Sequence, residues 1–169
     1  YDQPSDESAA RAGERRHYFG RLARRLTHIL TTRTAAGEVY AIDTRLRPSG
    51  RSGTLVTPLP AYHEYLRDTA WTWEHQALVR ARLVAGSETL KRRFETVRRD
   101  ILCQPRDAAT LQGAVRNMRQ RMRDNRPVTK EPGVDFKHGT GGLVDIEFLC
   151  QYLVLRHAAA DQELTTFRT

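Results

Sequence analysis

The sequence contains few cysteines and no long apolar run. Its 169 residues include only Cys103 and Cys150, which lie far apart and offer neither a disulfide framework nor paired metal-ligand spacing. No apolar stretch approaches the roughly 20 residues that a membrane-spanning helix needs. The first residues, YDQPSDESAARAGERR, contain no apolar signal core. We therefore expect a soluble protein of a reducing cytoplasm, with no membrane among its partners.

Aromatic residues and lysines are also scarce. Aromatic side chains make up 8% of the residues and do not interleave with the basic runs as a nucleic-acid stacking platform would. Basic residues outnumber acidic ones, with 28 Lys and Arg against 20 Asp and Glu, and nearly all of the basic residues are arginine. The resulting net charge of +8 attracts nucleic acid, nucleotides or an acidic protein surface without choosing among them. A basic nucleic-acid-binding helical module is thus an alternative, although no recognition motif favours it.

Helical periodicity dominates the sequence. Apolar residues between Phe19 and Leu30 predict a long amphipathic helix that starts after Asp6 and ends near Gly37. Ser87 and Asp107 are suited to cap two later helices, and Pro60 suits a first helical turn. Five further helices are predicted. The first two lie in PLPAYHEYLRDTA and in WEHQALVRARLVAG up to Gly86, and the next two begin after Ser87 and after Asp107. The last lies in LVDIEFLCQYLVL and follows a loop over residues 125–142.

Residues 39–47 have a period of two instead. In an extended conformation Asp43, Arg45 and Arg47 would share one face, with Tyr40, Ile42 and Leu46 on the other. The segment TLVT after the loop SGRSG predicts a neighbouring strand. Two short strands form a sheet too small to be stable alone, so we expect further strands from residues that precede Tyr1.

Asp43 is the first candidate for chemistry. It could be a structural ion-pair partner of Arg45 or Arg47. It could also bind a metal in a phosphate-transfer site, with the two arginines orienting phosphates. Two-metal nucleotidyl transfer needs several converging carboxylates, so Asp43 could not act alone.

The segment KHGTGGLVDIEF is the second candidate. Three glycines precede a helix whose first turns carry Asp145 and Glu147, and the amides of such a helix start favour negative charge. A flexible loop before an acid-favouring helix start is the simpler interpretation, since the segment lacks the P-loop and dinucleotide fingerprints. The third candidate, WTWEHQALVRAR with Glu74 and Arg80, could equally be a bundle helix with solvated arginines.

Three blocks, VYAIDTRLRPSGRSGTLV, WTWEHQALVRARLVAG and KHGTGGLVDIEFLCQYLVL, together resemble the bifunctional glutamine synthetase adenylyltransferase family, in the same order. The resemblance implies an α+β, predominantly helical fold. Residues 1–58 would end a polymerase-β-type nucleotidyltransferase lobe, and residues 59–169 would belong to a helical bundle. It also implies transfer of AMP from ATP to a tyrosine of glutamine synthetase with Mg²⁺, under the control of a nitrogen-regulatory signal protein.

The family has an adenylylating and an AMP-removing half, and DIEF with QYLVL is more similar to the C-terminal, adenylylating half. The phosphorolytic, AMP-removing half is the alternative.

The resemblance assigns roles to individual residues. Asp43 matches the third metal-binding acid of the family, whose first two are expected before Tyr1, so the chain alone is expected to be inactive. Arg45, Arg47 and Lys137 match positions suited to bind the nucleotide. Supporting positions beside the site or between the lobes are implied for Glu74, Arg80, Asp145 and Glu147.

Overall fold

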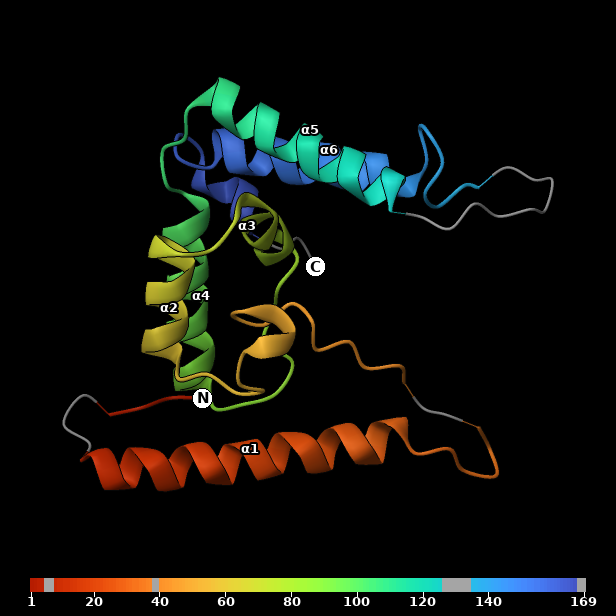
Figure 1. The fold of residues 1–169 in the computed structure, drawn as a ribbon. Coiled ribbons are helices and arrows are strands. Elements are labelled where there is room, and N and C mark those ends of the chain that lie inside the picture. Colours follow the sequence, from red (N-terminus) through yellow and green to blue (C-terminus); the bar gives the residue numbers. More distant parts are fainter. Residues whose placement is uncertain (5–7, 38–39, 126–134, 167–169) are drawn as a thin grey trace. The chain divides into compact units, whose positions relative to one another are not determined.

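In the computed structural model, residues 1–4, 8–37, 40–125 and 135–166 are described, and they form six α-helices and two short 3-10 helices (Figure 1). The chain divides into a first unit, Tyr1–Thr69, and a second unit, Ala70–Thr169. The predicted functional boundary after residue 58 remains a prediction. Within the described ranges, no helix combines the length and the apolar character needed to cross a membrane.

The first unit is built on α1 (Ala9–Thr31). The predicted amphipathic helix is confirmed, but it ends at Thr31 and not near Gly37, and residues 6 and 7, where the prediction begins, lie outside the described part. One face of α1 is packed, because Gly20 is buried beside Val56 and Phe19 stacks on Tyr1 with ring centroids 4.7 Å apart. A neighbouring apolar stripe stays exposed and consists of Tyr18, Leu22, Leu26 and Ile29. The helix therefore buries only part of its apolar surface.

The two predicted strands are wrong for the described residues. Residues 40–47 and 54–57 form no strand, and residue 39 lies outside the described part. Among the described residues, β pairing is limited to an isolated bridge between Thr34 and Gly37. The reason is that an extended segment needs a neighbouring backbone to complete its hydrogen bonds. A predominantly helical fold is confirmed, whereas a nucleotidyltransferase lobe is not supported by these residues.

A short loop and helix complete the first unit. After the 3-10 helix η1 (Gly50–Ser52), α2 (Leu59–Asp68) begins with Pro60 in its first turn, as predicted. The backbone amide of Leu59 donates to the carbonyl of Tyr1 at 2.8 Å, and the amino group of Tyr1 donates to Thr57 at 3.1 Å. The start of the chain is thereby tied to the start of α2.

The second unit contains α3 (Thr72–Val79), α4 (Glu88–Leu102), α5 (Ala108–Asp124), α6 (Leu143–His157) and η2 (Gln162–Thr165). Ser87 accepts from the amide of Leu90 at 3.2 Å and Asp107 from that of Thr110 at 2.8 Å, so both predicted caps are confirmed. Part of the predicted loop before α6, residues 126–134, lies outside the described residues.

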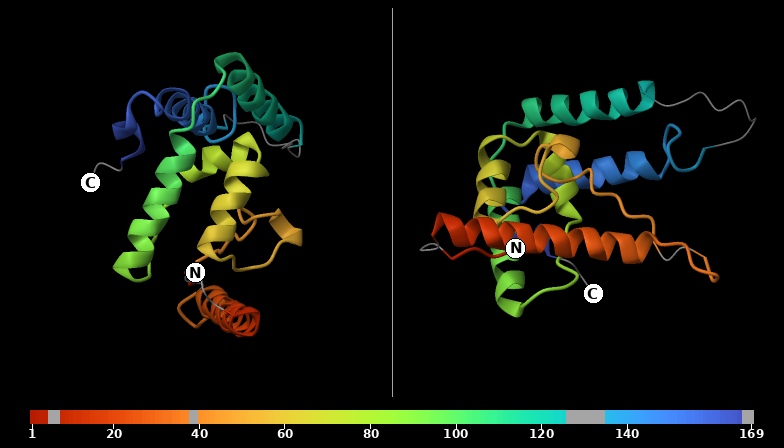
Figure 2. Two further views of the ribbon diagram at one scale, coloured as in Figure 1. Left: turned by 90° about the vertical axis from the view of Figure 1, so that its left-hand side faces the viewer. Right: turned by 60° about the horizontal axis from the view of Figure 1, so that its bottom comes forward.

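The core of the second unit lies where its helices meet. Helix α3 packs against α4, α5 and α6, and α5 lies beside α6 in every view (Figures 1 and 2). Leu78, Ile101, Leu102 and Leu155 are fully buried there. Because each fully buried aliphatic side chain contributes about 1.5–3 kcal/mol, this cluster stabilises the unit.

Helix α3 ends earlier than predicted, at Val79 instead of near Gly86. The buried guanidinium of Arg98 donates to the carbonyls of Leu78 at 3.0 Å and Val79 at 2.7 Å, and also to Thr165 at 2.7 Å. These contacts satisfy carbonyls at the C-terminal end of α3, where helical partners are lacking. No local sequence pattern predicts that an arginine of α4 holds this end.

Arginine thus has a structural use in this protein. Arg106 donates to four carbonyls at the ends of α4 and α6, including those of Ile101 at 2.6 Å and Leu155 at 3.4 Å. Burial lowers the pKa of Arg98 and of Arg106. Side chains that are committed to backbone carbonyls are not free to contact a polyanion, so the arginine excess is weaker support for nucleic-acid binding than its number suggests.

Candidate functional site

Asp43 lies on an exposed loop of the first unit and forms an ion pair with Arg45. Its carboxylate accepts from Nη2 of Arg45 at 2.6 Å, from Nε at 2.9 Å and from the backbone amide of Arg45 at 2.9 Å. The hydrogen bonds from the Arg45 side chain and backbone lower the pKa of Asp43 to about 2. The carboxylate is therefore ionised at neutral pH, and both of its oxygens are already in use.

Arg47 does not lie beside Asp43 as an alternating strand would have required. Its guanidinium folds back on the loop and donates to Thr44 O at 2.6 Å, Gly53 O at 3.2 Å and Arg51 O at 3.2 Å. A Cβ atom on Gly53 would lie only 1.9 Å from the carbonyl oxygen of Pro48, so the loop closes tightly at that glycine. Arg47 therefore holds the loop in this structure.

Asp145 is the centre of a second cluster of charged groups. It accepts from Arg119 Nε at 2.5 Å, from Arg123 Nη2 at 2.7 Å and from the amide of Gly141 at 2.8 Å. The amide of Gly141, followed by the two arginines, lowers the pKa of Asp145. Arg119 is buried and also donates to the carbonyl of His138 at 2.8 Å, so this cluster fastens the loop before α6 to α5.

The amides that begin α6 are not available to an anion. The amide of Leu143 donates to Phe136 O at 2.9 Å and that of Val144 donates to Lys137 O at 3.0 Å. Both contacts use the amides that a bound phosphate would need. The interpretation as a structural loop before an acid-favouring helix start is therefore favoured, and the acid is Asp145, which accepts from the amide of Gly141.

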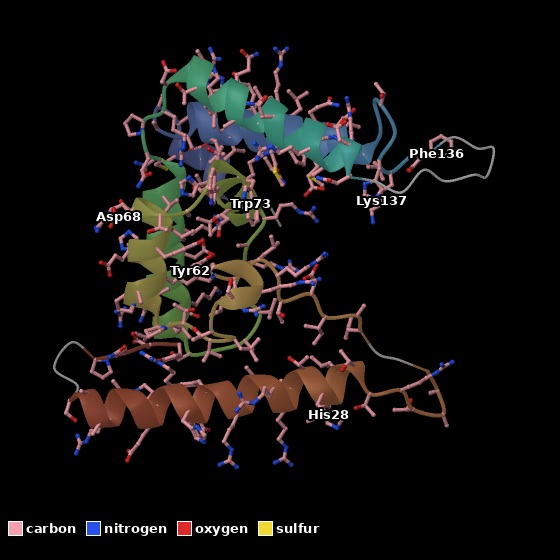
Figure 3. All side chains as sticks on the ribbon, in the orientation of Figure 1. His28, Tyr62, Asp68, Trp73, Phe136 and Lys137 are labelled. Atoms are coloured by element: carbon pink, nitrogen blue, oxygen red, sulfur yellow. The ribbon has the colours of Figure 1, made fainter. Side chains whose placement is uncertain are left out.

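The glycines of this loop are required by its tight path. A Cβ on Gly139 would lie 2.5 Å from Asp135 O and one on Gly142 would lie 2.7 Å from Phe136 O, while Gly141 has a φ of +77°. Phe136 and Lys137 are both exposed on the loop that leads into α6 (Figure 3). The loop thus has a fixed backbone and presents an aromatic ring and a cation outward.

The remaining candidates have structural contacts. Glu74 accepts from the amide of Trp71 at 2.9 Å and so caps the start of α3. Arg80 pairs with Glu147 at 2.5 Å across α3 and α6. Gln151 donates to Glu147 at 3.0 Å and accepts from Gln76 at 3.1 Å. Sequence reasoning missed Gln76 and Gln151, although a glutamine at a core position of an apolar helix is a recognisable signal.

The described residues do not form a complete magnesium site. They contain no group of three or more His, Cys, Asp or Glu side chains that could hold a metal ion. Magnesium prefers several hard oxygen ligands, whereas Asp43 is a single carboxylate beside arginines. Asp43, Arg45 and Arg47 do lie in one loop, but Lys137, Asp145 and Glu147 belong to the second unit, and the structure does not place the two units relative to each other.

The sequence model of the glutamate-ammonia ligase adenylyltransferase family matches residues 1–97, more than half of the chain. The chain belongs to this family. Five of the candidate residues lie in the matched region: Asp43, Arg45, Arg47, Glu74 and Arg80.

A curated relative extends the similarity. The bifunctional glutamine synthetase adenylyltransferase/adenylyl-removing enzyme of Vibrio parahaemolyticus is 51% identical to the chain over 150 residues. The match covers 89% of this chain but only 16% of the relative. The chain therefore spans about one sixth of the length of the curated relative that it matches.

Proposed function

We propose that the chain is a segment of a longer cytoplasmic enzyme that transfers AMP from ATP to a tyrosine of glutamine synthetase. The observation that carries this proposal is the 51% identity to a relative whose name states both adenylyl transfer and adenylyl removal. The family match over residues 1–97 supports the same activity. A nitrogen-regulatory signal protein would be a second partner of the complete enzyme.

In this proposal Asp43 is one of the ligands of Mg²⁺. It is exposed and ionised at neutral pH, as a carboxylate that binds a hard cation must be. Arg45 would have to release the Asp43 oxygens and could then contact ATP phosphates, and Lys137 would be a further nucleotide contact. Because the described residues supply one such carboxylate at this place, we assign no catalytic step to the metal.

The nucleotidyltransferase lobe is also part of the proposal. Residues 40–46 expose Tyr40, Ile42 and Leu46, which would share one face if the segment were extended, and α1 exposes its apolar stripe in the same unit. A β-sheet that extended residues 40–46 as an edge strand could satisfy their backbone groups and cover the α1 stripe with one apolar face. The two unpartnered surfaces thus support a sheet that is completed by other parts of the polypeptide.

We assign the chain to the adenylylating half because of the DIEF and QYLVL segments of α6. The AMP-removing half is the second candidate, since the relative is named for both reactions. If the chain belongs to the adenylylating half, loss of Asp43 should abolish AMP transfer. If it belongs to the removing half, loss of Asp43 should abolish AMP release. Each reaction can be assayed alone in a bifunctional enzyme.

The test replaces Asp43 by Asn in the full-length protein. AMP transfer from ATP to unmodified glutamine synthetase is measured separately from phosphate-dependent AMP release from the modified enzyme. We expect transfer to fall by about 10³-fold or more, because a lost metal ligand removes charge stabilisation of several kcal/mol, while release is retained. The matched control is Asp68→Asn, since Asp68 is 50% exposed and paired with Arg67, whereas Asp43 is 52% exposed and paired with Arg45.

Three outcomes can be told apart. Loss of transfer alone supports the proposal, and loss of AMP release alone assigns the chain to the removing half. If Asp43→Asn retains both activities as the Asp68→Asn control does, Asp43 has no part in the chemistry.

A further inference from the structure

Helix α6 is apolar on two opposite faces, and the described residues of the second unit cover only one of them. Val144, Gln151 and Leu155 are buried against the other helices of the unit. The outer face stays exposed and is formed by Leu143, Ile146, Leu149, Cys150 and Leu153, which we call the α6 stripe. The leucines and isoleucine of the stripe are exposed by 65%, 55%, 56% and 44% in chain order. A helix that is apolar all round is normally covered all round.

The spacing of the stripe indicates what shape would cover it. Residues 143, 146, 150 and 153 follow one another at intervals of three, four and three, which is the spacing of a helix–helix seam. Leu149 widens this seam on one side. None of the five residues is Asp, Glu, Lys, Arg or His, although the chain as a whole is strongly basic. The stripe therefore fits an uncharged aliphatic helix face and not an acidic surface.

The size of the stripe argues against a second copy of the chain as the occupant. A stable interface between separate proteins uses about 20–30 residues on each side. The stripe offers five residues on a single helix. A segment of the same polypeptide needs a smaller contact, because the connecting chain gives it a high effective concentration.

We propose that the α6 stripe is the docking site for a helix contributed by the part of the longer polypeptide that lies outside this chain. The inference rests on the proposal that the chain is a segment of a longer enzyme, which the 16% coverage of the relative supports. It does not depend on the direction of the reaction. The docked helix presents aliphatic residues at the same three-and-four spacing.

Cys150 provides a probe at the centre of the stripe. Its thiol is exposed, whereas Cys103 in the same unit is partly buried and burial raises its pKa. The alkylation rate of each cysteine by a maleimide is measured by peptide mass spectrometry, in the 169-residue chain and in the full-length protein. We expect the alkylation rate of Cys150 to be lower by a factor of about ten or more in the full-length protein, because a covered thiol reacts only while the contact is open. The rate for Cys103 should be similar in both proteins.

A substitution gives a second measurement. Ile146→Asp places a charge in the seam and should restore rapid alkylation of Cys150 in the full-length protein. Val84→Asp is the control, since Val84 is exposed and lies outside α6, and it should leave Cys150 protected. Because these readouts do not use activity, they are independent of the Asp43 test.

Equal alkylation rates of Cys150 in the two proteins would overturn the inference. So would protection that depends on the concentration of the 169-residue chain, which would indicate a second copy. Protection of the full-length protein only after glutamine synthetase is added would likewise overturn it, because the occupant would then be another protein.

Discussion

Gln76 of α3 donates a hydrogen bond of 3.1 Å to Gln151 of α6, and both side chains are buried in the second unit. Gln151 donates onward to Glu147 at 3.0 Å, and Arg80 reaches the same carboxylate from α3. The chain of contacts runs from the core to the surface and crosses between the two helices twice. Because α3 must align with α6 for all of these bonds to form, the pair fixes the register of the two helices.

Replacing Gln151 by Leu should destabilise the second unit. The amide of Gln76, whose Oε1 already has no hydrogen-bond partner among the described residues, would lose its remaining bond. We expect the free energy of unfolding to fall by about 1–3 kcal/mol, the cost of leaving a buried polar group unbonded. Urea denaturation of the 169-residue chain measures this change.

The double variant Gln76→Leu/Gln151→Leu measures the interaction energy between the two glutamines separately from the effect of each single substitution. It should be less destabilised than the sum of the single variants, because no orphaned amide remains. Gln112→Leu on an exposed position of α5 is the control and should change stability by less than about 0.5 kcal/mol. Strict additivity of the two core changes would show that the glutamines act independently.

Gly139→Ala and Gly113→Ala should have opposite effects. A Cβ at residue 139 would lie 2.5 Å from a backbone oxygen of Asp135, so the loop before α6 must shift. Gly113 lies inside α5 with nothing within 4 Å of its Cβ position. We expect Gly139→Ala to lower the free energy of unfolding by about 1–3 kcal/mol through strain. Gly113→Ala should raise it by about 0.5–1 kcal/mol through helix propensity.

Thermal and urea unfolding of the two glycine variants can be compared directly, since both carry the same chemical change. Amide exchange of Leu143 and Val144 adds a local readout, because their amides bond to the loop carbonyls. If Gly139→Ala leaves both the stability and this protection unchanged, the loop does not have the tight path described above.

The contribution of Asp145 to stability should depend on pH. The amide of Gly141 and the guanidiniums of Arg119 and Arg123 lower the pKa of this carboxyl from its ordinary value of 3.8. A carboxylate with a lowered pKa stabilises the fold above its unfolded-state pKa, and the stabilisation is lost as the pH falls through the folded-state value. The stability difference between the wild-type chain and Asp145→Asn should therefore be constant near neutral pH and shrink below about pH 4.

Urea unfolding at a series of pH values measures that difference. Asp43, Asp68 and Asp107 also have lowered pKa values, so both proteins will lose stability in acid and only their difference reports on Asp145. A difference that stays constant down to about pH 2 would contradict ionisation of Asp145 as the source of its effect.

The helices could be predicted from the sequence because their signals are local. Ser87 and Asp107 cap the helices that follow them, and the apolar periodicity of α1, α5 and α6 needs no knowledge of distant residues. The strand around Asp43 could not be judged in this way, because a strand depends on a partner backbone that its own pattern does not reveal. The period of two is present in the sequence, but residues 40–43, 45 and 46 are all exposed in the structure, so they form neither the two predicted faces nor a sheet.

Long-range polar contacts account for most of what sequence reasoning missed at the candidate site. Arg98 donates hydrogen bonds to the carbonyls of Leu78 and Val79, 20 and 19 residues before it, and of Thr165, 67 residues after it. No spacing rule connects such positions. Asp145 and Glu147 are candidates that the sequence alone suggests, but their partners Arg119 and Arg80 depend on how α5 and α3 pack against α6. The metal, nucleotide and lobe-interface roles of the selected residues stay predictions.

The hydrogen bond from Arg98 to the carbonyl of Thr165 sets a practical limit on shortening the protein. The acceptor lies in η2, near the last described residue, while the guanidinium lies in the core beside α3. An expression fragment that stops at Asp161 would lack this carbonyl and leave a buried cation with one fewer acceptor, which costs about 1–3 kcal/mol. Fragments for crystallisation or fusion should therefore extend past Thr165, which is buried where η2 packs against α4 and α6.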